Sequence, residues 1–277
     1  MPLFVVATPL GNLTDITYRA LEVLKAADFI AAEDTRHSRK LLDHYGIKTP
    51  MIPFHEHNEK SQSEKILQAL ADQKKVALIS DAGTPLISDP GYSLVKLAHD
   101  KKFPVIPIPG PCAVIAALSA SGLPSDHFIF EGFLPSKGES REKKLAAFKG
   151  ERRTVIIYES PHRILNLIEL IQKIFGDDRV ITVAREMTKQ FETIKQGPVS
   201  ALLAWMKADK NQQKGEFVVL LKGEDKEEQQ DHSLQEAKKI LTVLLKELSV
   251  KQAVSLTTQL THVNKKAVYE LALSLVG

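Results

Sequence analysis

Three turns of this sequence combine glycine with proline directly after a short apolar run. They span residues 8–12, 81–85 and 109–113. Proline fixes a turn, and glycine, which lacks a Cβ, lets the backbone approach a ligand closely. Short apolar runs are typical of buried parallel strands, and ligands of an open α/β sheet bind outside the carboxyl ends of its strands. The three turns together predict one binding site, although each alone is also typical of an ordinary tight loop.

The composition of the first turn limits the kind of ligand. Residues 8–12 hold a single glycine, and Pro9 has no N–H to offer. A dinucleotide site would need G-x-G-x-x-G here, and a P-loop would need G-x-x-x-x-G-K-[ST]; the sequence has neither. A ligand without phosphates, such as S-adenosylmethionine, fits better. The candidate residues for it in the turns are Pro9, Leu10, Gly11, Asp81, Gly83, Thr84, Pro109, Gly110, Pro111, Cys112 and Ala113.

Carboxylates at the ends of other apolar runs are candidates for a general base or for positioning a reacting group. Glu33 and Asp34 follow one run, Glu159 another and Glu186 a third. Asp34 also suits the cap of the following helix, and Glu186 could simply form a salt bridge with its neighbour Arg185. The sequence leaves these alternatives open. His55 and His57 have no third ligand at a recognised spacing, so we expect no metal.

The elements that must position these residues alternate between strand and helix. Apolar runs at residues 3–7, 28–32, 76–79 and 105–108, with helical patterns between them, predict a parallel sheet covered on both faces. We expect α/β architecture in a first domain over residues 1–121 and in a second over 122–223, with strands at 128–130, 154–158, 179–184 and 216–221. The third part, residues 224–277, is expected to be a linker and a helix-turn-helix-like tail; the linker composition begins at Gly223 and continues to Asp231.

The composition is that of a globular protein and excludes several other classes of protein. Of 277 residues, 43% are hydrophobic and 26% are charged, and the net charge is +3, so any contact with nucleic acid must be a local patch. Cys112 is the single cysteine, which rules out a disulfide within the chain. No run approaches the roughly 20 apolar residues of a membrane span, and the N-terminus lacks a basic region. We therefore expect a soluble, cytoplasmic protein.

Seven motifs resemble the RsmI family of small-subunit rRNA (cytidine 2′-O)-methyltransferases, which belongs to the tetrapyrrole-methylase-like methyltransferases. They occur in order along essentially the whole chain, at residues 6–13, 32–36, 80–91, 109–111, 158–163, 184–189 and 214–217. The longest begins with Ser80-Asp81-Ala82-Gly83-Thr84-Pro85. One position departs from the family, which usually has Ser where this chain has Cys112. The two side chains are similar in size, so we expect ligand binding to survive.

The resemblance implies more than the residues alone. It implies a homodimer of two-domain α/β chains, with S-adenosylmethionine in the cleft between the domains and a small helical tail. The acceptor would be the ribose 2′-hydroxyl of a cytidine in the decoding region of 16S rRNA. It adds Ile87, Tyr158, Ala184, Arg185 and Gly215 to the candidate donor site.

Contacts with RNA should be basic and local. A first cluster follows the joint to the second domain, a second lies near the predicted cleft, and a third opens the last helix. The first could equally be a solvated helix surface, and a basic helix end such as the third is usually only exposed surface. The candidates are Lys137, Arg141, Lys143 and Lys144, then Arg36 and Arg39, then Lys265 and Lys266.

Two other functions compete with rRNA methylation. A methylase of a small tetrapyrrole-like substrate would use the same cleft, but it would not need the helical tail or the basic stretch. A non-catalytic RNA-binding protein would not need the glycine- and proline-rich turns. The missing glycine fingerprint disfavours a nucleotide-dependent oxidoreductase.

Overall fold

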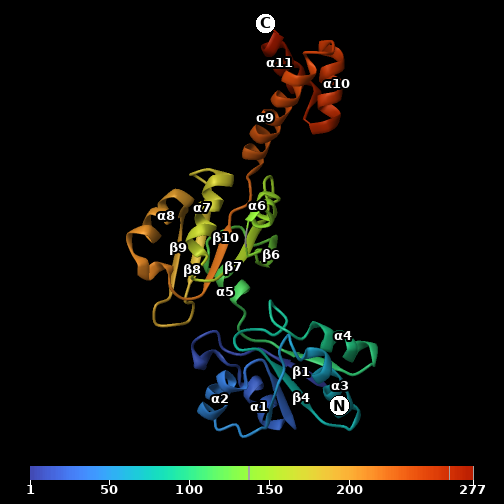
Figure 1. The fold of residues 1–277 in the computed structure, drawn as a ribbon, viewed down its shortest axis with the longest axis vertical. Helices are drawn as coiled ribbons and strands as arrows, with labels where there is room; N and C mark the ends of the chain where they lie inside the picture. The colour runs from blue at the N-terminus through green and yellow to red at the C-terminus, as the bar shows by residue number, and fades with distance from the viewer. Residues whose placement is uncertain (137, 262, 277) are drawn as a thin grey trace.

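The computed structural model describes residues 1–136, 138–261 and 263–276, and the side chains of 1–136, 138–225, 233–261 and 263–275. Lys137, a candidate RNA contact, therefore lies outside the described residues. The chain forms three parts that follow one another along the long axis of the molecule (Figure 1). These are a first sheet with its helices, a second sheet with its helices, and a helical tail.

The first sheet is parallel throughout, as the alternation of strand and helix predicts. Its strand order is β3-β2-β4-β1-β5, so the chain crosses over between non-adjacent strands. The strands are short and apolar because helices bury both faces of the sheet. They are β1 (Leu3–Val6), β2 (Phe29–Ala32), β3 (Met51–Pro53), β4 (Val76–Ile79) and β5 (Val105–Ile108).

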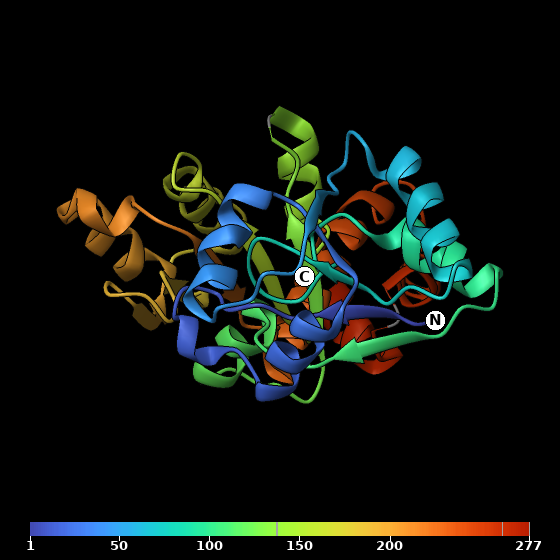
Figure 2. The ribbon, with the colours of Figure 1, turned by 90° about the horizontal axis from the view of Figure 1, so that it is seen from below.

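Two pairs of helices cover the first sheet. Leu24 of α1 (Tyr18–Ala26) and Leu42 of α2 (Thr35–His44) pack on Ile30 and Ile79. On the opposite face, α3 (Glu59–Ala71) and α4 (Tyr92–Asp100) pack on Leu3 and Leu78. Figure 2 shows the two pairs on opposite sides of the strands, in blue and in cyan. A one-turn 3-10 helix, η1 (Leu13–Asp15), leads from the first turn to α1.

The second sheet is mixed, with the order β6-β7-β10-β8-β9. Only β6 and β7 are parallel; the other neighbours are antiparallel. Helices α6, α7 and α8 cover one face. Its elements are β6 (Phe128–Phe133), α6 (Gly138–Ala146), β7 (Thr154–Glu159), α7 (Ile164–Phe175), β8 (Val180–Arg185), β9 (Thr193–Pro198), α8 (Val199–Ala208), η2 (Lys210–Gln213) and β10 (Phe217–Leu221).

Helix α5 (Ala113–Ala120) covers the other face of the second sheet. Its residues Val114, Ala117 and Leu118 pack on Ile156 and Leu220. The sequence predicts α5 as the last helix of the first domain, before a joint at residues 122–125. Its packing is on the second sheet, so the chain passes between the two sheets in the turn before Ala113.

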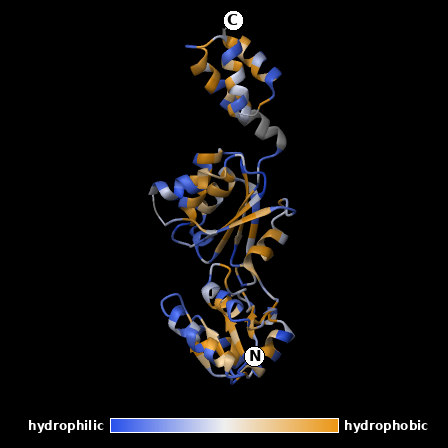
Figure 3. Ribbon diagram, turned by 90° about the vertical axis from the view of Figure 1, so that its right-hand side faces the viewer, coloured by the Kyte–Doolittle hydropathy of each residue, from blue (hydrophilic) through white to orange (hydrophobic). Residues whose placement is uncertain are grey.

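The helical tail has its own core. Helices α9 (Lys226–Leu244), α10 (Val250–Thr261) and α11 (Lys265–Val276) enclose Leu241, Val254 and Val268. Figure 3 shows apolar segments on all three helices of this part. The predicted linker at residues 223–231 is wrong in extent, because α9 already begins at Lys226. Within the described residues, no helix is long and apolar enough to cross a membrane.

Candidate functional site

The three glycine- and proline-rich turns come together at the carboxyl ends of β1, β4 and β5. Thr8 and Gly83 exchange two backbone hydrogen bonds: the N–H of Thr8 donates to Gly83 O at 2.8 Å, and that of Gly83 donates to Thr8 O at 3.0 Å. The Thr84 hydroxyl donates to Pro111 O at 2.9 Å, which joins the second turn to the third. The turns thus form one connected edge of the sheet.

A cavity of about 390 Å³ lies between this edge and the second sheet. Eight candidate donor residues line it: Leu10, Asp81, Gly83, Thr84, Ile87, Cys112, Ala113 and Tyr158. The sequence did not single out most of the other lining residues, which include Ser88, Asp89, Phe133, Met187, Phe217 and Val218. Asp89 stands in the motif at residues 80–91, so the motif was a signal for it. Phe133 and Val218 had no such signal, because they come from strands whose contact with the first sheet is not encoded locally.

Close backbone contacts shape the wall of turns. Gly83 has a φ of +80°, and a Cβ there would lie 3.1 Å from Leu10 Cδ2. A Cβ at Gly110 would lie 3.0 Å from the Cβ of Ala7. Both glycines therefore allow the turns to approach one another, and at Gly83 the left-handed conformation also disfavours any other residue.

Five acidic residues line the same cavity. Glu159 and Glu216 form ion pairs with Arg141 and Lys189, and the other three are Glu33, Asp81 and Asp89. Burial, joined by the negative charges of Asp89 and Asp81, raises the pKa of Glu33. Burial and the charge of Asp81 raise the pKa of Asp89 to about 6, against an opposing hydrogen bond from Ser80. The site therefore combines negative charge with apolar walls, which suits a cation that carries an apolar or aromatic body. S-Adenosylmethionine, with its sulfonium, ammonium and adenine, has this chemistry.

Asp34 acts as the cap of helix α2 and not as a cavity residue. Its carboxylate accepts hydrogen bonds from the N–H groups of Arg36 at 2.8 Å and His37 at 3.4 Å. The bonds from the backbone and side chain of Arg36 lower the pKa of Asp34. Its own N–H donates to Asp81 Oδ1 at 2.9 Å, so the residue also fixes that cavity carboxylate. This geometry favours the capping alternative.

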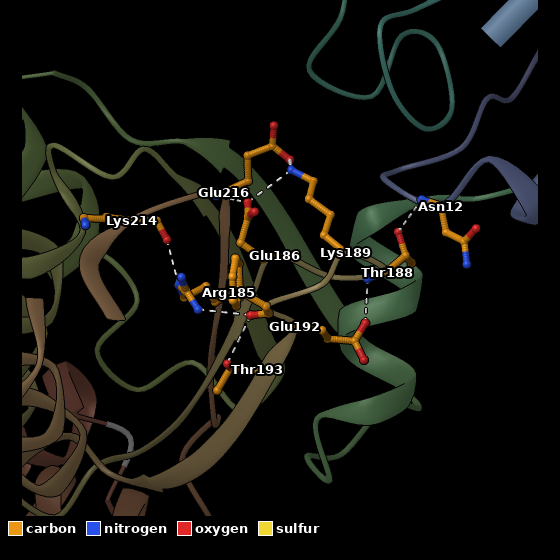
Figure 4. A network of polar contacts seen from close by, with 10 residues as sticks. Asn12, Arg185, Glu186, Thr188, Lys189, Glu192, Thr193, Lys214 and Glu216 are labelled. Atoms are coloured by element: carbon orange, nitrogen blue, oxygen red, sulfur yellow. Dashed lines mark hydrogen bonds and ion pairs between the residues drawn. The ribbon is translucent and has the colours of Figure 1, made fainter. Parts of the chain in front are cut away.

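Glu186 belongs to an ion-pair network beside the cavity (Figure 4). Lys189 Nζ donates to Glu186 Oε1 at 3.1 Å and to Glu216 Oε2 at 2.8 Å, and the N–H of Glu216 donates to Glu186 Oε1 at 2.9 Å. Burial opposes these contacts, but together the Glu216 N–H and Lys189 lower the pKa of Glu186. A carboxylate held in this way is a poor proton acceptor, which favours the salt-bridge alternative.

The other candidate donor residues are not among the described residues that line the cavity. The Arg185 side chain is used in hydrogen bonds to two backbone carbonyls: its Nε donates to Lys214 O at 2.7 Å and its Nη1 to Phe191 O at 3.0 Å. Gly11 lies against the Lys189 side chain, where a Cβ would collide with Lys189 Cγ. The remaining candidates outside the lining are Pro9, Pro109, Gly110, Pro111, Ala184 and Gly215.

Most of the candidate RNA contacts are exposed, but Arg141 is buried. It pairs with the buried carboxylate of Glu159, with Nη2 and Oε2 2.6 Å apart, and so is not available to a phosphate. Lys144 pairs with Glu131 at 2.9 Å, and Arg36 pairs with Asp34 at 3.4 Å. Arg39, Lys143, Lys265 and Lys266 are exposed. Within the described residues, no group of three or more His, Cys, Asp or Glu side chains is placed to hold a metal ion.

Comparison with known proteins identifies relatives over the whole length. Residues 2–203 match the family of tetrapyrrole (corrin/porphyrin) methylases, and residues 231–275 match the RsmI C-terminal HTH domain. Proteins named ribosomal RNA small subunit methyltransferase I are similar to this chain: 48% identical in Escherichia coli, over 99% of this chain and 96% of the relative, and 50% identical in Pseudomonas aeruginosa, over 99% and 98%.

Two solved structures share the fold. They are a uroporphyrin-III-C-methyltransferase from Thermus thermophilus, with a TM-score of 0.57, and a cobalt precorrin-4 methyltransferase of cobalamin biosynthesis, with a TM-score of 0.58. Each is 17% identical and covers 80% of this chain and 94% of its own. From the matched family model and the full-length relatives, the chain belongs to the tetrapyrrole (corrin/porphyrin) methylases and, within them, to the family of ribosomal RNA small subunit methyltransferase I.

Proposed function

We propose that this protein transfers a methyl group from S-adenosylmethionine to the ribose 2′-hydroxyl of a cytidine in the decoding region of 16S rRNA, within the small ribosomal subunit. The observation that carries the proposal is the similarity, over 99% of this chain, to relatives named ribosomal RNA small subunit methyltransferase I. The cytidine and the 2′-hydroxyl follow from the motif resemblance. A reaction in the cytoplasm, where ribosomes are assembled, follows from this substrate.

The donor would occupy the cavity between the turns and the second sheet. When bound, it supplies a methyl group on a cationic sulfur that is already electrophilic, so the proposed reaction needs no metal. Gly83 and Thr84 would present backbone and hydroxyl groups to the donor, and the negative charge of Asp81 would favour its cationic groups. Ala184, Arg185 and Gly215 would act indirectly, by holding the segment that carries Met187 and Glu216 at the cavity wall.

Asp89 is the proposed general base. The ribose oxygen would attack the methyl carbon, a C–O bond would form as the C–S bond breaks, and the hydroxyl proton would pass to the carboxylate. A base is most effective when its pKa lies near the working pH, and the pKa of Asp89 is raised to about 6. Glu33, also in the cavity and with a raised pKa, is the competing candidate. Asp34 and Glu186 are assigned structural roles.

Contacts with RNA are proposed for exposed cations on three helices. Arg36 and Arg39 lie on α2, which starts beside Asp81 at the cavity. Lys143 and Lys144 lie on α6, and Lys265 and Lys266 open α11 in the tail. In this proposal residues 224–277 dock on the ribosomal subunit, while the two sheets bind the donor. The enzyme is proposed to act as a homodimer, as the family resemblance implies.

Transfer of labelled methyl groups tests the function. Wild-type protein would be offered small ribosomal subunits, naked 16S rRNA and uroporphyrinogen, with calorimetric titrations of S-adenosylmethionine and of NAD in parallel. We expect heat with S-adenosylmethionine and label in the small subunits, at a ribose oxygen after nucleoside digestion. Label in uroporphyrinogen alone would instead support a small-tetrapyrrole methylase, and heat with NAD alone would contradict the donor.

A further inference from the structure

One aromatic residue in the cavity wall is largely exposed to solvent. Phe133, the last residue of β6, lines the cavity and is nevertheless 55% exposed. An exposed phenylalanine loses the free energy of burying its ring, so a position of this kind invites a functional explanation. The turns of the first sheet form the wall opposite the second sheet, and an acceptor as large as RNA could reach only the open part of the cavity.

A bulge in β6 sets the position of this ring. The register between β6 and β7 shifts between Phe130 and Gly132, and Gly132 has a φ of +70°. A bulge re-aims the side chains that follow it. A Cβ at Gly132 would lie 3.2 Å from Ser88 Oγ, so the bulged strand passes against the loop that carries Asp89. Phe133 and the proposed base, Asp89, line the same cavity.

The Phe133 ring packs against another aromatic side chain of the second sheet. Tyr158, paired with Phe133 in the sheet register, packs edge-to-face against it with ring centroids 5.6 Å apart. Tyr158 packs in the same way against Phe130, at 5.0 Å. Aromatic pairs in this geometry are mutually stabilising. Tyr158 therefore covers part of the Phe133 ring, while the residue as a whole remains exposed.

The backbone after Phe133 is also fixed. Arg163 Nη2 donates to Leu134 O at 2.7 Å and to Pro135 O at 3.2 Å. Arg163 Nε lies 3.1 Å from Glu159 Oε1, and the second oxygen of Glu159 is held by Arg141 at 2.6 Å. A buried charge network thus holds the segment in place. Such preorganisation lowers the cost of ordering a platform when a ligand binds.

From this arrangement we propose that Phe133 is the platform on which the base of the acceptor nucleotide stacks, outside the RNA helix, while its ribose faces Asp89. This inference rests on the proposed function. Single-stranded RNA is recognised largely by stacking of splayed-out bases on aromatic side chains, and enzymes that act inside nucleic acid move the target nucleotide out of the stack. Stacking makes no hydrogen bonds to the edge of the base. Phe133 would therefore position the nucleotide without selecting cytosine over other bases.

The test compares Phe133→Leu with Phe133→Tyr and with Phe128→Leu. Phe128 lies at the other end of β6 and is 38% exposed, so its variant controls for the loss of a partly exposed ring on the same strand. Each protein would be assayed for methyl transfer to small subunits, for S-adenosylmethionine affinity by calorimetry and for melting temperature. We expect kcat/KM of Phe133→Leu to fall about 10- to 100-fold, with donor affinity unchanged. Its melting temperature should fall only slightly, by the contribution of the lost aromatic pair with Tyr158. Phe133→Tyr should restore most of the activity, and Phe128→Leu should match the wild type.

The outcomes distinguish a failure of the stacking platform from a failure of the proposed function. If the wild type methylates small subunits and Phe133→Leu does so equally well, the platform is refuted and the enzyme's function stands. If Phe133→Leu loses donor affinity, the ring belongs to the donor and not to the acceptor, which also refutes the platform. If the wild type transfers no methyl group to small subunits, the proposed function falls, and the platform falls with it.

Discussion

Asp81 and Asp89 lie in one cavity, and the charge of Asp81 adds to burial in raising the pKa of Asp89 to about 6. A carboxylate accepts a proton only when it is ionised. Methyl transfer should therefore decline as the pH falls through about 6 and level off above it. Removing a general base typically costs about 100- to 10,000-fold in rate, so kcat of Asp89→Asn should fall by at least about 100-fold and lose this acidic limb. Glu33→Gln is the matched comparison, and retention of the limb in Asp89→Asn but not in Glu33→Gln would assign the base to Glu33.

The same pKa has a consequence for stability. The folded state raises the pKa of Asp89 above 3.8, so the folded protein binds the proton more tightly than the unfolded chain does between that value and about 6. Ionised Asp89 thus destabilises the fold, and the penalty is fully present above pH 6 and disappears towards pH 4. We expect Asp89→Asn to melt at a higher temperature than the wild type at pH 8, with the difference shrinking as the pH is lowered. Equal melting temperatures at pH 8 would contradict the raised pKa.

Gly83→Ala should weaken donor binding. The φ of +80° and the close approach to Leu10 both oppose a Cβ, so we expect a loss of about 1–3 kcal/mol in unfolding free energy and a lower calorimetric affinity for S-adenosylmethionine. Gly46→Ala is the control, because Gly46 has a φ of +64° but no neighbouring atom within 4 Å of the added Cβ. The Gly46→Ala variant should show only the loss in unfolding free energy that the positive φ causes. Equal donor affinity in the two variants would exclude a role for the Gly83 turn.

The elements that the sequence predicts correctly are those with local signals. Apolar runs ending in glycine and proline mark β1, β4 and β5, and the turns after them do meet at one cavity. Strand β9 was missed because its sequence, Thr193–Pro198, is mostly polar and exposed at the edge of the sheet and ends in Gly-Pro, which are the signals of a loop.

The other differences arise from contacts between distant residues. The burial of Arg141 depends on Glu159, 18 positions away, and nothing beside Arg141 in the sequence distinguishes it from the exposed Lys143. Helix α5 looks like a continuation of the first domain because strand and helix alternate up to that point. The apolar residues on one face of the second sheet, mainly from β7, β8 and β10, determine where it packs. Phe133 enters the cavity through a bulge that depends on the pairing of β6 with β7.

Breaking the Arg141–Glu159 pair should be costly. In Arg141→Met the Glu159 carboxylate stays buried and loses one of its two cationic partners, so we expect the unfolding free energy to drop by about 3–5 kcal/mol in denaturant titrations. Lys173→Met removes an exposed partner of Glu142, the neighbour of Arg141 on α6, and should cost at most about 1 kcal/mol. Similar losses of unfolding free energy in the two variants would show that burial does not increase the cost of breaking the Arg141–Glu159 pair.

Replacing Lys265 and Lys266 by Ala tests the role of the tail in RNA binding. Both side chains are exposed at the start of α11, and the apolar core of the tail lies elsewhere, so the fold and the affinity for S-adenosylmethionine should be unchanged. If both lysines contact phosphates, binding to small subunits should weaken, and the slope of log K against log salt should become shallower by up to about 2. Lys238→Ala/Lys239→Ala, a pair of exposed lysines on α9, controls for the loss of charge alone. If the two double variants change affinity and slope equally, the tail contributes to RNA binding only through its overall positive charge and not through specific contacts of Lys265 and Lys266. If neither changes them, the tail does not contact RNA through these helices.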